Sequence, residues 1–141
     1  MAIIKRDTDY ALRALAKLAV TDDFLSVSAL AEAENIPEDF LRKIMQTLHR
    51  AGMVESRQGP FGGYRLAVAP KQVTLLAVLE AVQGPAELNE CFEAPGACER
   101  AGHCPVRAQL CRLQSAFNEQ MERVTLESIL RQVPSEERSR R

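Results

Sequence analysis

The pattern that most restricts the fold of this chain is three amphipathic segments, two of them joined by a short turn. The first covers residues 8–20, the second residues 28–34, and the third runs from Pro37 to about Ala51. Each has apolar residues at the spacing of one helical face. In the third segment we expect a buried stripe made of Leu41, Ile44, Met45 and Leu48. Three such helices predict a helix-turn-helix.

Residues at the predicted helix starts are candidate caps. Asp7 or Thr8 can cap the first helix, and Ser28 the second, by accepting a hydrogen bond from an orphan backbone N–H. Pro37 suits the first turn of the third helix. Residues 73–82 form a further, very apolar segment, which predicts a buried helix capped by Thr74.

A hairpin pattern follows the third helix directly. Residues 53–56 and 64–67 are predicted strands, and the turn between them contains three glycines, Gly59, Gly62 and Gly63. Glycine supplies positive φ and lets the backbone approach a partner closely. A hairpin at this place is a wing. The predicted fold is therefore mainly α, a winged helix-turn-helix head with a two-stranded wing.

The charge is concentrated on the third helix and the wing. Residues 42–71 carry six basic residues and one acidic residue, although the whole chain has a net charge of −1. A solvated charged face is the simpler interpretation, but a basic stripe that coincides with helix and wing favours double-stranded DNA as partner. The candidate DNA-binding residues are Arg42, Lys43, Gln46, Arg57, Gln58, Gly62, Gly63, Tyr64 and Arg65.

The C-terminal part combines a long loop with a long helix. Residues 86–103 show little periodicity, and a loop of this length in a compact domain needs a functional reason. From Cys104 to about Gln132 the pattern is helical again, with a long apolar stripe. The small head cannot bury that stripe alone. We therefore expect the helix to pack against the same helix of a second subunit, which gives a homodimer.

All four cysteines lie in this part of the chain, with the spacing Cys91-x6-Cys98-x5-Cys104-x6-Cys111. The closely spaced pairs of structural zinc sites and of thiol oxidoreductases are absent from the sequence. Wide spacing on a glycine-containing loop favours an iron–sulfur cluster. Cys111 lies about 10.5 Å beyond Cys104 along a helix axis. The expected ligands are therefore Cys91, Cys98 and Cys104, with Cys111 a buried core thiol or a redox group and His103 an additional candidate ligand.

Other classes of protein find little support. The first ten residues lack the apolar core and cleavage site of a signal peptide, and no apolar run is long enough for a membrane span. We therefore expect a cytoplasmic protein that contacts no membrane. The sequence has two histidines, no pair of nucleophile and base, and no phosphate-binding loop, so we expect no enzyme.

Four segments carry a resemblance to a known family: TDYALR (8–13), IPEDFLRKI (36–44), GPFGGY (59–64) and VTLLAVLEAV (73–82). Together with the three-cysteine loop they resemble the Rrf2 family of bacterial winged-helix transcription regulators, iron–sulfur cluster type. The resemblance extends from Lys5 to about Leu130. It implies a homodimer that controls promoters and a cluster that senses iron, redox state or nitric oxide.

Two branches of that family differ in the fourth ligand. The iron–sulfur-biogenesis branch (IscR-like) uses a histidine three residues after the third cysteine, where this chain has Arg107, which stays protonated. The nitric-oxide-sensing branch (NsrR-like) uses a carboxylate from the first helix of the partner, and Asp9 matches that position. The resemblance thus implies a 4Fe–4S cluster with Asp9 of the partner subunit, and a 2Fe–2S cluster is the alternative. Asp9 is equally explained as a helix-start carboxylate.

The wing departs from the biogenesis branch. Gln58 stands where those proteins have a base-reading arginine, and Arg42 stands where they have a glutamate, so the resemblance does not imply their operator.

The sequence thus predicts four regions: a DNA-binding domain (1–84), a cluster-binding loop (85–103), a dimerisation helix (104–133) and a disordered tail (134–141). From this we derive the hypothesis that loss of the cluster frees the loop, and that the freed loop shifts the geometry of the dimer on DNA. A thiol/disulfide regulator or a zinc-dependent regulator of the same fold is the alternative.

Overall fold

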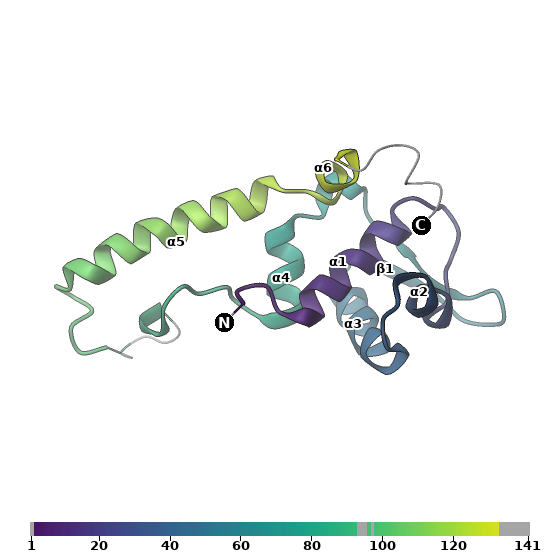
Figure 1. Ribbon diagram of the computed structural model, residues 1–141, viewed down its shortest axis with the longest axis horizontal. Helices are drawn as coiled ribbons and strands as arrows, with labels where there is room; N and C mark the ends of the chain where they lie inside the picture. Colours follow the sequence, from purple (N-terminus) through teal and green to yellow (C-terminus); the bar gives the residue numbers. More distant parts are fainter. Residues whose placement is uncertain (1, 93–95, 97, 133–141) are drawn as a thin grey trace.

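A computed structural model describes residues 2–92, 96 and 98–132 (Figure 1). Most of these residues are helical, and a two-stranded antiparallel sheet accompanies the helices. The elements are α1 (Arg6–Leu18), α2 (Val27–Glu34), α3 (Glu38–Arg50), β1 (Val54–Arg57), β2 (Gly63–Leu66), η1 (Pro70–Gln72), α4 (Leu75–Gln83), η2 (Glu90–Phe92), α5 (Pro105–Arg123) and α6 (Leu126–Arg131). The predicted fold class is confirmed: a mainly helical chain with a winged helix-turn-helix.

The core of the head lies between α1, α2, α3 and the first wing strand, and Val78 of α4 and Leu126 of α6 complete it. The apolar faces predicted from helical spacing meet there, and all four members of the α3 stripe are buried. The fully buried residues of the other helices include Ala11, Leu15, Leu18 and Leu30. Burial of large aliphatic side chains is the main stabilising term of such a core, at about 1.5–3 kcal/mol for each.

The predicted caps of the first two helices are wrong. Helix α1 begins at Arg6, and Lys5 precedes it without a side-chain cap. Thr8 is instead fully buried, and its hydroxyl donates to Gln83 Oε1 at 2.6 Å. In α2 the cap is Ser26, whose Oγ accepts from the Ala29 N–H at 3.1 Å, and not Ser28.

The turn of the helix-turn-helix is set by its backbone. Asn35 ends α2 in the left-handed region, with φ 52°. Ile36 is buried, and Pro37 precedes α3, which keeps the turn short. Asparagine tolerates this conformation better than most residues.

The wing strands are antiparallel, and Val54 pairs with Leu66 and Arg57 with Gly63. They lie within one residue of their predicted positions. A further bridge joins Leu25 to Tyr64, with backbone hydrogen bonds of 2.8 and 2.9 Å. The wing is therefore tied to the segment before α2 as well as to α3.

The predicted single helix over 104–132 is wrong, because α5 ends at Arg123 and α6 begins at Leu126. Between them the backbone is extended, and Thr125 forms a bridge with Thr74. Backbone bonds of 2.8 Å (Leu75 N to Val124 O) and 2.9 Å (Leu126 N to Val73 O) hold this connection. As a result α6 folds back onto the head and Leu126 is buried.

Helix α5 extends away from the head as an arm (Figure 1). Its last turns pack on the head, where Met121 is buried against Leu79 and Ala86. Its middle turns contact the segment after α4, where Gln114 exchanges hydrogen bonds with Ala86 and Leu88. Farther out, Val106 is 63% exposed and Leu113 is 58% exposed. Helix α4 is less buried than predicted, since Val78 and Leu79 are its only buried residues; Thr74 caps it as predicted.

The predicted disordered tail (134–141) lies outside the described residues. No helix among residues 2–92 and 98–132 combines the length and apolar character that a membrane crossing requires.

Candidate nucleic-acid interface and cysteine segment

Helix α3 has one polar face, opposite its buried stripe. Arg42, Lys43 and Gln46 are all exposed there, as the helical spacing predicts, and their contact with DNA stays a prediction. Arg42 Nη2 lies 2.5 Å from Glu38 Oε1, one turn earlier, so its charge is partly compensated. Lys43 makes no ion pair with any residue that the structure describes. The free positive charge on this face is smaller than the composition suggests.

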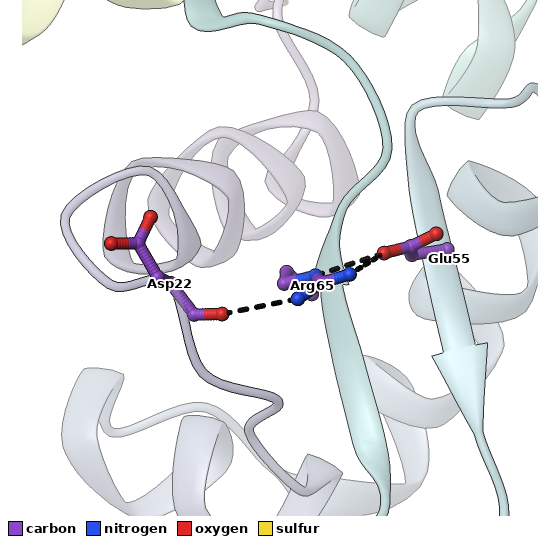
Figure 2. A network of polar contacts seen from close by, with 3 residues as sticks. All are labelled: Asp22, Glu55 and Arg65. Atoms are coloured by element: carbon purple, nitrogen blue, oxygen red, sulfur yellow. Dashed lines mark hydrogen bonds and ion pairs between the residues drawn. The ribbon is translucent and has the colours of Figure 1, made fainter.

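Arg65 connects the wing to the loop before α2 (Figure 2). Its Nε and Nη2 donate to Glu55 Oε1 at 2.8 and 2.5 Å, and its Nη1 donates to the Asp22 carbonyl at 3.4 Å. Its guanidinium carbon also lies 4.5 Å from the centroid of the Phe24 ring. Arg65 is therefore engaged within the protein, and Glu55 compensates its charge.

Arg57 stands on the same aromatic ring but has no acidic partner among the described residues. Its guanidinium carbon lies 4.2 Å from the Phe24 centroid. Its Nη2 donates to the Phe61 carbonyl at 2.8 Å, which closes the wing tip. Arg57 thus brings an uncompensated positive charge to the wing. The sequence pattern missed Phe24 as the shared platform.

The remaining candidate residues shape the wing. A Cβ at Gly62 would collide with the Arg57 carbonyl, and one at Gly63, where φ is 142°, with the Leu25 carbonyl. Tyr64 is half-buried, and its ring packs edge-on against His49 of α3 at 6.4 Å between centroids. Gln58 is exposed. Gly62, Gly63 and Tyr64 therefore fix the wing backbone against the head.

The four cysteines are free and half-buried. Cys91 lies in η2, and Cys98 lies in the loop that follows. Cys104 is the N-cap of α5, where its Sγ accepts from the Arg107 N–H at 3.5 Å. Cys111 lies two turns farther along α5; the prediction of a buried core thiol is wrong for this chain, because α5 projects from the head.

The described residues hold no ready-made metal site. No three of their His, Cys, Asp and Glu side chains are close enough together to hold a metal ion. His103 is exposed, beside Cys104 in a shallow hollow. The donor set fits an iron–sulfur group in its chemistry, because three thiols lie on one segment, but the structure does not bring them together.

Arg107 reaches across the cysteine segment. Its guanidinium carbon lies 5.5 Å from the centroid of the Phe92 ring, so the first turn of α5 contacts η2. Its Nε is buried and has no acceptor among the described residues. A buried donor without a partner is unfavourable by about 1–3 kcal/mol. An anionic sulfur beside Arg107 would accept from this Nε–H. This buried donor is therefore a second feature, after the three thiols, that fits an iron–sulfur cluster.

Asp9 lies in the first turn of α1 and is exposed. Its Oδ2 is 3.7 Å from Arg13 Nη1. Arg13 also contacts Glu34, through its carboxylate at 3.6 Å and through its carbonyl. Asp9 is therefore held loosely, in an ion pair that leaves it accessible to another partner.

Sequence comparison decides the family. The profile of the Rrf2 family, described as an iron-dependent transcriptional regulator, matches residues 4–132. The chain belongs to the Rrf2 family. Its relatives are transcription regulators and not enzymes, and binding to DNA is the activity of this class.

Three similar proteins illustrate the family. Protein aau3 of Rhizobium meliloti is 33% identical over 93% of this chain and 86% of its own length. The regulator NsrR of Halalkalibacterium halodurans is 33% identical over 87% of this chain and 86% of its own. The solved structure of CymR, the global cysteine regulator of B. subtilis, has a TM-score of 0.76 and 26% identity, and the match covers 95% of this chain and all of that one.

Proposed function

We propose that this Rrf2-family protein binds promoter DNA as a homodimer, and that Cys91, Cys98 and Cys104 hold an iron–sulfur cluster that sets its affinity for DNA. The observation that carries the proposal is the position of the three thiols. They lie on the one segment that joins α4 of the head to the projecting helix α5. The other end of α5 is anchored on the head through Val124 and Met121, so a change in the order of the cysteine segment would act on the outer end of the arm.

The DNA contacts divide between helix and wing. In a winged helix-turn-helix the second helix of the motif, which is α3 in this chain, enters the major groove, and the wing contacts the minor groove or phosphates. Arg42, Lys43 and Gln46 are therefore proposed to contact base edges or phosphates from α3. The residues proposed for the wing are Arg57, Gln58, Gly62, Gly63, Tyr64 and Arg65.

The proposed dimer rests on the exposed apolar residues of α5. Val106 and Leu113 are more than half exposed, and they lie seven residues apart, on one face of α5. Packing α5 against its counterpart in a second subunit would bury both. In this proposal residues 1–84 bind DNA, residues 85–103 form the cluster loop and residues 104–133 make the dimer.

Each ligand has a proposed role. Cys104 would hold one end of the loop at the start of α5, and Cys91 the other end in η2. The buried Nε–H of Arg107, which has no acceptor among the described residues, is proposed to donate to a cluster sulfur. Asp9 of the partner subunit is the proposed fourth ligand of a 4Fe–4S cluster, with a 2Fe–2S cluster as the alternative. When bound, such a cluster supplies a redox-active centre, and the protein would respond to redox state, nitric oxide or iron–sulfur status.

A second candidate function is thiol-based regulation. Four free, half-buried thiols on neighbouring segments can also form reversible disulfides. The similarity to a cysteine regulator at 26% identity favours this alternative. A zinc-dependent regulator is the third candidate.

The test is metal and sulfide analysis of full-length protein purified without oxygen, with visible absorption spectra, before and after reconstitution with iron and sulfide. We expect iron and sulfide in the wild type, loss of both in Cys98→Ala, and retention in the control Cys111→Ala. Protein that stays colourless and iron-free after reconstitution contradicts the cluster. In that case zinc in the metal analysis would support the zinc regulator, and DNA binding that peroxide changes and a thiol reductant restores would support the thiol regulator.

A further inference from the structure

Phe61 is the most exposed large apolar residue among those the structure describes, at 85%. It stands at the tip of the wing, within the Gly59-Pro60-Phe61-Gly62 turn. Single exposed apolar residues are common on protein surfaces, so exposure alone carries no function. The surroundings of this ring are more informative.

The backbone at Phe61 is held from two sides. Arg57 Nη2 donates to the Phe61 carbonyl at 2.8 Å, and the Gly62 N–H donates to the Gly59 carbonyl at 3.0 Å. The absence of a side chain at Gly62 allows this tight turn, since a Cβ would strike the Arg57 carbonyl. The tip therefore presents the ring from a fixed backbone, and ordering it on a partner requires little further loss of backbone entropy.

The charge around the ring is positive. Residues 57–65 contain two arginines and no acid. Glu55 compensates Arg65, whereas Arg57 has no acidic partner among the described residues and is held beside Phe61. An exposed apolar ring on a residue whose carbonyl is bound by an uncompensated arginine, at the end of a hairpin, is complementary to the DNA minor groove, which has apolar sugar walls and a negative potential.

We propose that Phe61 enters the minor groove of the operator as an apolar wedge that partly unstacks one base step, while Arg57 interacts with the neighbouring phosphates. Minor-groove proteins use apolar wedges in this way. The step would be a flexible pyrimidine–purine step, because such steps are the easiest to unstack. The inference rests on the proposed placement of the wing on DNA. It gives the protein a preference for a flexible base step at the wing contact, where no hydrogen bond to a base edge is needed to select the sequence.

The test compares Phe61→Ala, Phe61→Trp and Arg57→Gln in the full-length protein. The probe is a duplex that the wild type enriches from a random DNA library, and Kd is measured by fluorescence anisotropy at several salt concentrations. We expect Phe61→Ala to weaken binding by about tenfold, as for the loss of one stacked aromatic contact, and Phe61→Trp to restore it. Because no charge is lost, the salt dependence of log Kd should stay unchanged. Arg57→Gln should reduce that slope by about 0.9.

Unstacking is read directly with 2-aminopurine placed at successive positions of the enriched duplex. The wild type should raise its fluorescence at the wing contact, and Phe61→Ala should not. The proposal is overturned if Phe61→Ala leaves both Kd and this fluorescence unchanged, or if it alters the molar mass of the protein, which would make the tip a protein contact. Failure of the wild type to enrich any duplex would instead contradict the proposed DNA function itself.

Discussion

Arg65 holds the wing through contacts that a lysine cannot reproduce. Its guanidinium donates to Glu55 and to the Asp22 carbonyl (Figure 2), and it also lies over the Phe24 ring. A planar group with five donors can make all these contacts at once. The side chains of Arg65 and Glu55 are 43% and 45% exposed, so the ion pair alone contributes at most about 1 kcal/mol.

We expect Arg65→Lys to lower the free energy of unfolding by about 1 kcal/mol, because a lysine lacks the second donor to Glu55 and cannot stack on the Phe24 ring as a guanidinium does. Urea denaturation of Arg65→Lys, Glu55→Gln and the double variant measures the coupling between the two residues. A coupling of roughly 0.5–1 kcal/mol is expected, and strictly additive losses would show that the pair does not hold the wing.

Gln83 binds the chain start to the end of α4 with both ends of its amide. Its Oε1 accepts from the Thr8 hydroxyl at 2.6 Å and from the Lys5 N–H at 3.0 Å, and its Nε2 donates to the Ile3 carbonyl at 2.8 Å. Thr8 is fully buried, so its hydroxyl depends on this acceptor. Gln83 is also the last residue of α4, immediately before the segment that leads to the cysteines.

We expect Gln83→Ala to destabilise the protein by about 1–3 kcal/mol, since a buried hydroxyl is left without an acceptor. Thr8→Val is the matched control: it removes the hydroxyl itself at nearly constant volume, so no buried donor is left without an acceptor and its loss should be smaller. Thermal or urea unfolding compares the two variants. Equal losses would mean that the hydroxyl left without an acceptor in Gln83→Ala carries no penalty.

Helices α1, α2 and α3 could be predicted to within two residues, because their apolar stripes follow local spacing and meet in one core. The break between α5 and α6 could not. Residues 124 and 125 fit a helical stripe, and only pairing with residues 73–75, about fifty positions earlier, makes them extended. The cap predicted for α1 was wrong for the same reason, since Thr8 bonds to a residue 75 positions away.

The candidate site was predicted unevenly. Exposure of Arg42, Lys43 and Gln46 follows from the helical period. A count of charges, in contrast, cannot show that Arg65 has an acidic partner and that Arg57 has none among the described residues. The register of the hairpin carried the missing information, since it places Glu55 directly opposite Arg65. The cysteine ligand set stays a prediction, because spacing along a loop does not fix where its thiols lie in space.

Thr125 separates the arm from the last helix. Its Oγ1 accepts from the Ser128 N–H at 3.1 Å, and Ser128 Oγ accepts from the Thr125 N–H at 3.0 Å. We expect Thr125→Ala to lower the free energy of unfolding by about 1 kcal/mol, as for the loss of an N-cap. Ser115→Ala, on the exposed side of α5, is the control and should change little. If urea denaturation gives both variants wild-type stability, the cap does not hold α6 on the head.

The molecule consists of a head with a projecting arm (Figure 1), and the proposed dimer depends on this arm. We expect Leu113→Glu to convert the proposed dimer to a monomer, because it would bury a charge in the apolar seam of α5. Val20→Glu is the matched control, since Val20 is exposed to a comparable degree (44%) at the end of α1. Light scattering after size-exclusion chromatography gives the molar mass, and a dimer that persists in Leu113→Glu contradicts the role of the arm.

The proposed function requires a link between the cysteine segment and the DNA-binding head. The most direct measurement is the Kd of the enriched duplex, determined without oxygen for one preparation loaded with iron and sulfide and for the same preparation after iron is removed by a chelator. A coupling of about 1–3 kcal/mol predicts Kd values that differ by roughly 5- to 150-fold. Cys98→Ala should give the chelated value under both conditions. Equal affinity of the loaded, stripped and Cys98→Ala proteins would contradict the account.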